Sequence, residues 1–293
     1  MSQTILDLIK KRNVLFDGGM GTELMRLGFS QGECPELWND MHPDRVRSIH
    51  QAYFDAGADA VLTNSFGGSR IKLQSYGLAE RCFELNEKAA RLVNSARPDG
   101  RFVGGSLGPT GHFLEPLGTA KKEDFISSYS EQCEGLAAGG VDFFLIETQY
   151  SLDEALCAYE AARKSSNHPI CVTLTFNQTP KGFFTMMGHS LKDFVESFSS
   201  VEVAALGANC TLNSSQIADL ILELHQLTDI PLIAQANAGQ PIMDDEGNVS
   251  YDQGFDEYVK HIPRLLQNGA RIIGGCCGTN PDYIKKMASI IHS

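Results

Sequence analysis

The chain has 293 residues, of which 42% are hydrophobic and 20% are charged, and its formal net charge is -12. This length is long for one ordinary domain but typical of a single α/β barrel. The acidic balance argues against nucleic acid and anionic membrane surfaces as partners, and because no run of about 18 apolar residues occurs, no membrane span is expected.

The cysteine content and the start of the chain indicate a compartment. Residues 1–10 form an amphipathic start without a secretory apolar region and cleavage site. Eight cysteines are too few and too unevenly spaced for a disulfide scaffold. We therefore expect a protein of the reducing cytoplasm, where thiolates are available as ligands.

Eight short apolar runs, separated by segments with helical patterning, are the main feature along the chain. Continuous apolar runs, rather than alternating ones, predict strands that are buried on both faces of a parallel sheet. The predicted strands are 14–19, 60–66, 102–107, 143–148, 170–176, 203–210, 231–236 and 271–275. The predicted helices are 44–56, 69–76, 79–96, 122–138, 152–164 and 191–198, with another after 215 and one that runs from 281 through 291.

Eight strands that alternate with helices predict an α/β fold, a single (β/α)8 TIM barrel, with one domain over residues 1–293. A doubly wound open sheet is the alternative. That fold would carry Gly-x-Gly-x-x-Gly after the first strand, whereas residues 17–22 read Asp-Gly-Gly-Met-Gly-Thr. No interdomain linker is found.

Three cysteines at two strand ends form the most specific pattern. Cys210 ends the sixth strand, and Cys276 and Cys277 end the eighth within Gly-Gly-Cys-Cys-Gly, 274–278. We expect these glycines to free the strand end so that both thiols face one ligand. Alternate strands bring side chains to one level of a barrel, and three thiolates with an open fourth position are typical of catalytic zinc. Simple burial is the alternative reading for each cysteine alone, and we favour it for the other five.

Polar residues at four other strand ends are candidates for the rest of the site. Asp17 precedes Gly18 and Gly19, whose backbone N–H groups could meet a carboxylate, although a tight turn capped by Asp17 explains the pattern equally well. Glu147 closes an apolar strand, which favours contact with a ligand amine. Asn64 ends the second strand, and Asn237, after the seventh, could support a metal site from behind.

Six segments together resemble the homocysteine S-methyltransferase family. The resemblance extends from Val14 to Ile291 and is closest to the homocysteine-binding module of cobalamin-dependent methionine synthase, here standing alone. The segments are Asp-Gly-Gly-Met-Gly-Thr (17–22), Thr-Asn-Ser-Phe-Gly-Gly (63–68), Ser-Leu-Gly-Pro-Thr-Gly (106–111), Ile-Glu-Thr (146–148), Gly-Ala-Asn-Cys (207–210) and Gly-Gly-Cys-Cys-Gly (274–278).

The resemblance implies that Cys210, Cys276 and Cys277 hold Zn²⁺, with the homocysteine sulfur in the fourth position. It also implies that Glu147 binds the substrate amine and that the backbone around Asp17 and Gly18 binds its carboxylate. A free thiol is mostly protonated at neutral pH, and zinc removes that proton, so the bound sulfur becomes a nucleophile toward an activated methyl group.

The methyl donor is less well defined. Betaine-using relatives carry a tryptophan in the first βα loop, which Trp38 matches, and tyrosines at positions that correspond to Gly67 and Thr148. A quaternary ammonium needs aromatic faces around it. The absence of these two tyrosines weakens the betaine reading, although Phe66, Phe113 and Tyr150 lie close in sequence. The likeness to the synthase module favours a methyl-corrinoid protein over betaine or S-methylmethionine, and the long loops 177–190 and 240–253 could form a broad mouth for such a partner.

Two other classes of protein remain as alternatives. A phosphate-binding barrel aldolase or isomerase would use Gly274-Gly275 and the following helix N-terminus, but it gives no role to three cysteines. A non-catalytic zinc-binding subunit would need a fourth ligand from the protein, whereas an enzyme should leave that position open.

Overall fold

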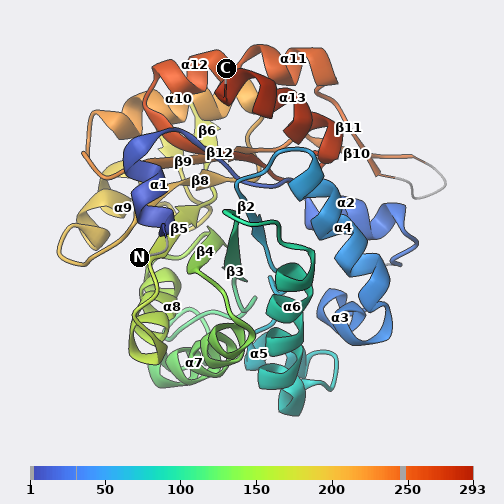
Figure 1. Cartoon of the computed structure of the whole chain (residues 1–293). Coiled ribbons are helices and arrows are strands. Elements are labelled where there is room, and N and C mark those ends of the chain that lie inside the picture. Colours follow the sequence, from blue (N-terminus) through green and yellow to red (C-terminus); the bar gives the residue numbers. More distant parts are fainter. Residues whose placement is uncertain (1–2, 31, 245–248, 293) are drawn as a thin grey trace.

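Eight parallel strands form the central sheet of the computed structural model, which describes residues 3–30, 32–244 and 249–292 (Figure 1). The order of the strands is β1-β12-β9-β8-β5-β4-β3-β2. Their bounds are β1 (Val14–Leu15), β2 (Ala60–Leu62), β3 (Phe102–Leu107), β4 (Phe143–Gln149), β5 (Ile170–Leu174), β8 (Ala205–Asn209), β9 (Leu232–Ala236) and β12 (Ala270–Gly275).

The two ends of this sheet meet, so the sheet is a barrel. Phe16 and Ala60 form a parallel bridge between the chain after β1 and the start of β2, and the Asp59 N–H donates to the Leu15 carbonyl at 2.7 Å. The predicted (β/α)8 barrel is therefore confirmed. The first strand is shorter than predicted, because only Val14–Leu15 pair regularly with β12, while 17–19 turn away toward the mouth.

Helices surround the barrel, and two hairpins extend its loops. The helices are α1 (Ile5–Lys11), α2 (Met20–Arg26), η1 (Pro35–Leu37), α3 (Trp38–Met41), α4 (Pro43–Asp55), α5 (Arg70–Gln74), η2 (Ala79–Arg81), α6 (Cys82–Ala96), α7 (Lys122–Gly139), α8 (Leu152–Ser165), α9 (Leu191–Phe198), α10 (Ser214–His225), α11 (Phe255–Lys260), α12 (Ile262–Gln267) and α13 (Pro281–Ile291). The hairpins are β6 (Asn177–Thr179) with β7 (Gly182–Phe184) and β10 (Pro241–Met243) with β11 (Val249–Tyr251). Residues 245–248 of the second predicted long loop lie outside the described residues.

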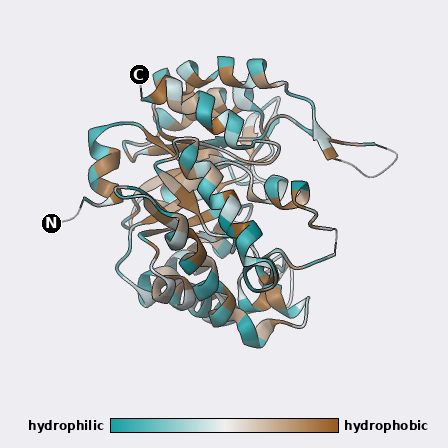
Figure 2. Cartoon of the chain, turned by 45° about the vertical axis from the view of Figure 1, so that its right-hand side comes forward, coloured by the Kyte–Doolittle hydropathy of each residue, from teal (hydrophilic) through white to brown (hydrophobic). Residues whose placement is uncertain are grey.

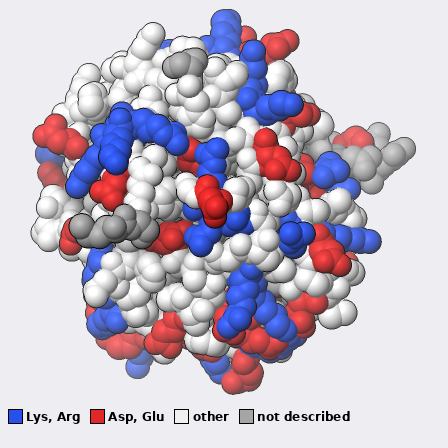
Figure 3. Space-filling view, in the orientation of Figure 1, with Lys and Arg blue, Asp and Glu red and all other residues white. Residues whose placement is uncertain are grey.

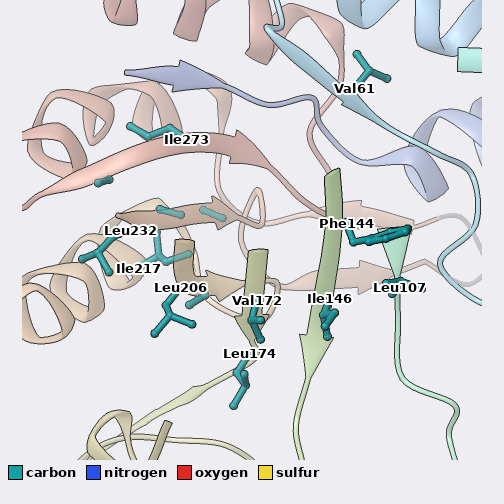
Figure 4. Close-up of a cluster of buried hydrophobic side chains, with 14 of the residues drawn as sticks. Val61, Leu107, Phe144, Ile146, Val172, Leu174, Leu206, Ile217, Leu232 and Ile273 are labelled. Atoms are coloured by element: carbon teal, nitrogen blue, oxygen red, sulfur yellow. The ribbon is translucent and has the colours of Figure 1, made fainter. Parts of the chain in front are cut away.

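The larger core lies between the barrel and its helices. Alternate strand residues such as Phe144, Ile146, Val172 and Leu206 point outward into this layer (Figure 4). They are buried because helices cover the sheet from outside with their apolar faces, while the hydrophilic faces of the helices meet water (Figure 2). This two-sided burial explains why the strand sequences read as continuous apolar runs.

A second core fills the barrel interior below the mouth. Inward side chains including Phe16, Phe143 and Ile233 pack there with Ile5 and Leu8 of α1. Helix α1, in blue in Figure 1, therefore plugs the end of the barrel at which the strands begin. The interior is closed at that end, so a ligand must enter at the other end, where the strands terminate.

Charged side chains of both signs lie interspersed on the face shown in Figure 3. At the plugged end, the buried carboxylate of Asp59 accepts hydrogen bonds from Arg12 at 2.7 and 2.8 Å, from Arg101 and from the Leu15 N–H, and contacts His292 at 3.0 Å. Among the helices of the described residues, none has the length and apolarity that a membrane span requires.

Candidate metal centre and substrate pocket

A pocket of about 260 Å³ opens at the carboxyl ends of the strands. Its walls come from the chain after β1, from β2, and from the ends of β4, β8, β9 and β12. This is the end of a TIM barrel at which active sites are built. The predicted site residues that line the pocket are Asp17, Gly18, Asn64, Glu147, Cys210, Cys276 and Cys277.

The three cysteines come together at one side of this pocket. Their Sγ atoms all lie within 4.8 Å of one another, and those of Cys210 and Cys277 are 4.0 Å apart. A tetrahedral zinc ion with Zn–S bonds of about 2.3 Å would place its sulfurs about 3.8 Å apart. The donor set and its spacing therefore fit a metal ion such as zinc. The other five cysteines are buried.

Unusual backbone geometry brings the thiols together. Cys210 and Thr211 have φ angles of 62° and 50°, in the left-handed region that non-glycine residues seldom occupy. Among the described residues beyond β12, Gly278 alone has a positive φ, of 81°. The expectation that Gly274 and Gly275 supply conformational freedom is therefore wrong for this pair. Glycine is required at 275 because an added Cβ would overlap the Thr279 side chain, which hydrogen-bonds to the Cys276 carbonyl at 2.7 Å.

The thiols interact electrostatically even before a metal is considered. Hydrogen bonds from Cys276 and Cys277 lower the pKa of Cys210. The hydrogen bond with Cys210 raises the pKa of Cys276 and of Cys277, and burial adds to the effect. The protein alone thus stabilises one thiolate, whereas three thiolates at this spacing need a cation among them.

Two side chains lie behind the cluster. The Cys277 N–H donates to Asn237 Oδ1 at 3.1 Å, so Asn237 lies where a supporting residue was expected. The Tyr251 side chain on β11 hydrogen-bonds to the Cys277 thiol, and its ring lies against Gly278, where an added Cβ would come within 2.5 Å of Cγ. Both contacts restrict the position of Cys277.

Glu147 ends the inward face of β4 and is buried. Its Oε1 accepts a hydrogen bond from Ser106 Oγ at 2.6 Å, and its Oε2 accepts one from Asn209 Nδ2 at 3.2 Å. Burial raises the pKa of Glu147 to about 7, the Ser106 bond opposes this shift, and the charge of Cys210 adds to it. A buried carboxylate with this pKa binds a cation readily, because a positive partner restores the charged form.

Two acceptor atoms at the pocket lack hydrogen-bond partners among the described residues. Asp17 Oδ2 accepts from the Leu62 N–H at 2.8 Å, but Asp17 Oδ1 is buried with no hydrogen-bond partner among the described residues, and so is Gln235 Oε1. Burial raises the pKa of Asp17, and the neighbouring charge of Glu147 raises it further. These two oxygens are therefore available to accept hydrogen bonds from a ligand in the pocket.

Two of the other predicted substrate residues, Asn64 and Trp38, make structural contacts. The amide of Asn64 donates to the Pro35 carbonyl at 2.8 Å and to Asn39 Oδ1 at 3.1 Å, so it fixes the wall of the pocket. Trp38 does not line the pocket. Its indole N–H donates to Glu33 Oε2 at 2.9 Å, and its ring packs against Phe29, His42 and Arg45.

Gly67, at the position that corresponds to a tyrosine in betaine-using relatives, packs against Glu36 in this structure. The Gly67 N–H donates to Glu36 Oε1 at 2.6 Å, and an added Cβ would lie only 3.0 Å from that oxygen. Phe66 supplies the one aromatic ring among the described residues that line the pocket. The pocket therefore lacks the several aromatic faces that a quaternary ammonium requires.

Sequence reasoning missed several residues of the site, namely Ser106, Asn209, Glu36, Gln235 and Tyr251. Ser106 and Asn209 both lie in the segments that carry the family resemblance, and Asn209 directly precedes Cys210. Their inward placement follows from strand alternation once the register is known. Tyr251 carried no signal, because it comes from a hairpin in an apparent loop.

A closed eight-stranded barrel with three convergent thiols and buried carboxylates at its mouth has the features of an enzyme site that can hold a metal ion. The sequence matches the homocysteine S-methyltransferase family over residues 14–291, and the chain belongs to that family. Membership confirms the family that the sequence motifs indicated, and with it an S-methyltransferase as the class of enzyme.

Individual relatives agree with this assignment. Methionine synthases of Mycobacterium tuberculosis and Mycobacterium leprae are each 28% identical over 98% of this chain, and the chain spans about a quarter of the length of these relatives. Among solved structures, the metallated form of the homocysteine methyltransferase MmuM from Escherichia coli aligns with a TM-score of 0.80 and 26% identity, covering 97% of this chain and 98% of that one.

Proposed function

We propose that the protein transfers a methyl group to homocysteine and forms methionine, with zinc held by Cys210, Cys276 and Cys277. The observation that carries this proposal is the convergence of three thiols beside a buried carboxylate in one small pocket. Zinc at this position would remove the proton of the substrate thiol and leave its sulfur nucleophilic.

The chain's own residues orient the substrate. We place the homocysteine ammonium between Glu147 and the unpartnered Oδ1 of Asp17, because each offers an acceptor inside the pocket. This refines the expectation for Asp17, whose side chain then joins the amine site, while the backbone at Gly18 remains the candidate for the substrate carboxylate. Asn237 supports the cluster through the Cys277 N–H.

The reaction needs a substrate sulfur and a methyl group in line, with little water between them. The sulfur forms a bond to the methyl carbon, and the bond between that carbon and the donor breaks, its electron pair leaving with the donor. The buried walls of the pocket exclude water from this step, and the two carboxylates hold the substrate still. No proton transfer from a side chain is required once the thiol is deprotonated.

For the methyl donor, we favour a methyl-corrinoid protein. Among the described residues, the pocket offers one aromatic ring; the Gly67 N–H is bonded to Glu36, and Trp38 is buried away from the pocket. Exposed apolar residues, Met186 beside β7 and Ile242 and Met243 on β10, provide contact surface for a protein partner. The similarity to methionine synthases, of which the barrel is one part, agrees with this donor.

A small-molecule donor is the second candidate. MmuM, a homocysteine methyltransferase, is matched over 98% of its length, so a barrel of this size is a complete enzyme in that case. S-methylmethionine and betaine are the small donors to compare, and the single aromatic ring among the described residues of the pocket disfavours betaine. We also propose the reducing cytoplasm as the compartment, because the three thiols of the site must stay reduced to serve as ligands.

The test is a direct comparison of donors. Zinc-loaded protein is given homocysteine with methylcobalamin, S-methylmethionine or betaine, and methionine is measured over time. We expect methylcobalamin to be used best among the three. Saturable turnover with betaine at millimolar concentration would reject the donor assignment, and no methionine from any donor, with homocysteine bound, would reject methyl transfer to homocysteine.

A further inference from the structure

The side chain of Asn209 lies between the two halves of the site. Asn209 ends β8, directly before Cys210. Its Nδ2 donates to Glu147 Oε2 at 3.2 Å and lies 3.9 Å from the Sγ of Cys276. One amide group therefore contacts both the carboxylate at the amine site and a thiol of the metal cluster.

The amide itself is fixed by hydrogen bonds to two neighbouring strands. Asn209 Oδ1 accepts from the Thr148 N–H at 2.8 Å and from Thr173 Oγ1 at 2.9 Å, and Nδ2 also donates to Thr148 Oγ1 at 2.7 Å. Because a backbone N–H can only donate, the oxygen must face Thr148. This arrangement directs Nδ2 toward Glu147.

The same side chain adjoins two strained backbone positions. Thr148, directly after Glu147, has a φ of 57°, and Cys210, directly after Asn209, has a φ of 62°. Such conformations persist where surrounding contacts hold them, and they are concentrated at functional sites. The Asn209 side chain bonds both the backbone N–H and the Oγ1 of Thr148. It therefore links the backbone conformation after Glu147 to the backbone conformation at Cys210.

We propose that Asn209 is a positioning residue that sets the distance between the amine site and the metal thiols, and thereby selects an amino thiol with the chain length of homocysteine. The inference rests on the proposed function. Homocysteine has three carbons between nitrogen and sulfur, whereas cysteine has two. With its sulfur at the cluster, cysteine falls short of Glu147 by about one C–C bond, roughly 1.5 Å.

The experiment compares ligands that differ only in the amine or in chain length. Zinc-loaded full-length protein and its Asn209→Ala variant are titrated calorimetrically with homocysteine, cysteine and 4-mercaptobutanoate, which lacks the amine. The wild-type protein should bind homocysteine about 10- to 100-fold more tightly than 4-mercaptobutanoate, the range of one hydrogen bond to a charged group. In Asn209→Ala, affinity for homocysteine should fall at least about tenfold, with little change for 4-mercaptobutanoate.

Two further variants separate positioning from general support of the fold. Asn209→Leu keeps the approximate size of the side chain but loses the donor toward Glu147, so it should lose the preference for the amine. Its melting temperature and zinc content, measured beside the affinities, show whether the fold and the metal site are intact. Thr175→Val removes a contact with Thr211 Oγ1, 3.1 Å away, on the strained segment beyond Cys210. It does not touch Glu147 and should keep the wild-type ratio of affinities.

The results have distinct meanings. A collapse of the ratio between homocysteine and 4-mercaptobutanoate in both Asn209 variants, together with weaker discrimination against cysteine, supports the inference. Equal losses for all three ligands, or an unchanged ratio, overturn it and leave Asn209 a structural residue. If the wild-type protein shows no preference for homocysteine, the proposed function fails first, and selection by Asn209 fails with it.

Discussion

The three thiols of the cluster come from the ends of two strands. Cys210 follows β8 and has a strained backbone, whereas Cys276 and Cys277 both follow β12. Each thiol is therefore held by different backbone contacts. The removal of any one leaves two sulfurs, which are too few for a stable zinc site of this kind.

Cys276→Ala should lose most of its zinc while the barrel stays folded, because the site loses a ligand but the core loses only one sulfur. Metal analysis of the purified protein, with circular dichroism as a check on the fold, measures both. Cys157→Ala is the matched control, since Cys157 is buried on α8 away from the cluster and its loss should leave about one zinc per chain. Full zinc in Cys276→Ala would refute the ligand assignment.

Glu147→Gln should weaken homocysteine binding by about 1.5–3 kcal/mol, the range for a hydrogen bond to a charged group. Burial raises the pKa of Glu147 to about 7, above its ordinary value of 4.5. The folded protein thus holds the proton more tightly than the unfolded chain does, and above pH 4.5 the carboxylate increasingly destabilises the fold.

The same variant should therefore be more stable than wild type at pH 8, by about 1–3 kcal/mol, with no such gain at pH 4. Urea unfolding of the metal-free proteins at the two pH values measures the difference. Equal free energies of unfolding for the two proteins at pH 8 would show that the ionised Glu147 does not destabilise the fold.

The sequence predicts a site residue when its local pattern is unusual, and it misses one whose role depends on contacts with other strands. Cys210, Cys276 and Glu147 stand at the ends of apolar runs, where a polar residue is conspicuous. Asn209 and Gln235 are single amides whose partners lie on other strands, so their roles depend on register. Trp38 lies in the first βα connection, as the resemblance implies, but it does not line the pocket, and the sequence of this connection carries no periodic pattern that fixes which residue does.

At the scale of the elements, β12 is shaped by close packing as much as by hydrogen bonds. Its end packs against the turn that contains Thr279. Because β12 pairs with β1 on one side and with β9 on the other, it cannot shift to make room for a larger side chain. The position of the two thiols therefore depends on the absence of a side chain at Gly275.

Gly275→Ala should displace Cys276 and Cys277 and reduce zinc affinity by at least about tenfold, because its Cβ would overlap Thr279. Competition with a zinc chelator measures the affinity. Gly21→Ala is the control for folding, since Gly21 lies in α2 with no atom within 4 Å of an added Cβ, and there alanine should be neutral or stabilising. Unchanged affinity in Gly275→Ala would show that the turn adapts.

The strands were easier to predict than the loops between them. Buried parallel strands carry an apolar signal along their whole length, so all eight were found, although β1 was drawn too long. The hairpins β6–β7 and β10–β11 were missed, because β6 and β10 are exposed along their length and have no apolar face to mark them. Helices α11 and α12 were overlooked for their shortness.

At the scale of the whole molecule, Asp59 ties distant parts of the chain together at the plugged end of the barrel. It is bonded by Arg12, Arg101 and the Leu15 N–H, and it contacts His292. Burial alone would raise the pKa of Asp59, but the bonds from Arg12 and Leu15 outweigh it and the pKa is lowered.

Asp59→Asn should destabilise the protein by about 1–3 kcal/mol at pH 7, allowing for the partial exposure of the two arginines. A carboxylate with a lowered pKa contributes stability above its ordinary value of 3.8, and this contribution is lost as the pH falls through the folded-state value. The gap between variant and wild type should thus be constant from pH 5 to pH 8 and narrow below about pH 4. Thermal unfolding across this range tests it, and a gap that persists at pH 3 would contradict the assignment.

During synthesis β12 is the last of the eight strands to leave the ribosome. It pairs with both β1 and β9, and it carries two of the three thiols. Until it emerges, β1 lacks its main neighbour and Cys210 has no thiol beside it. Closure of the barrel and completion of the thiol cluster therefore depend on the same strand, so any metal that the three thiols hold can be bound only after this strand has been translated.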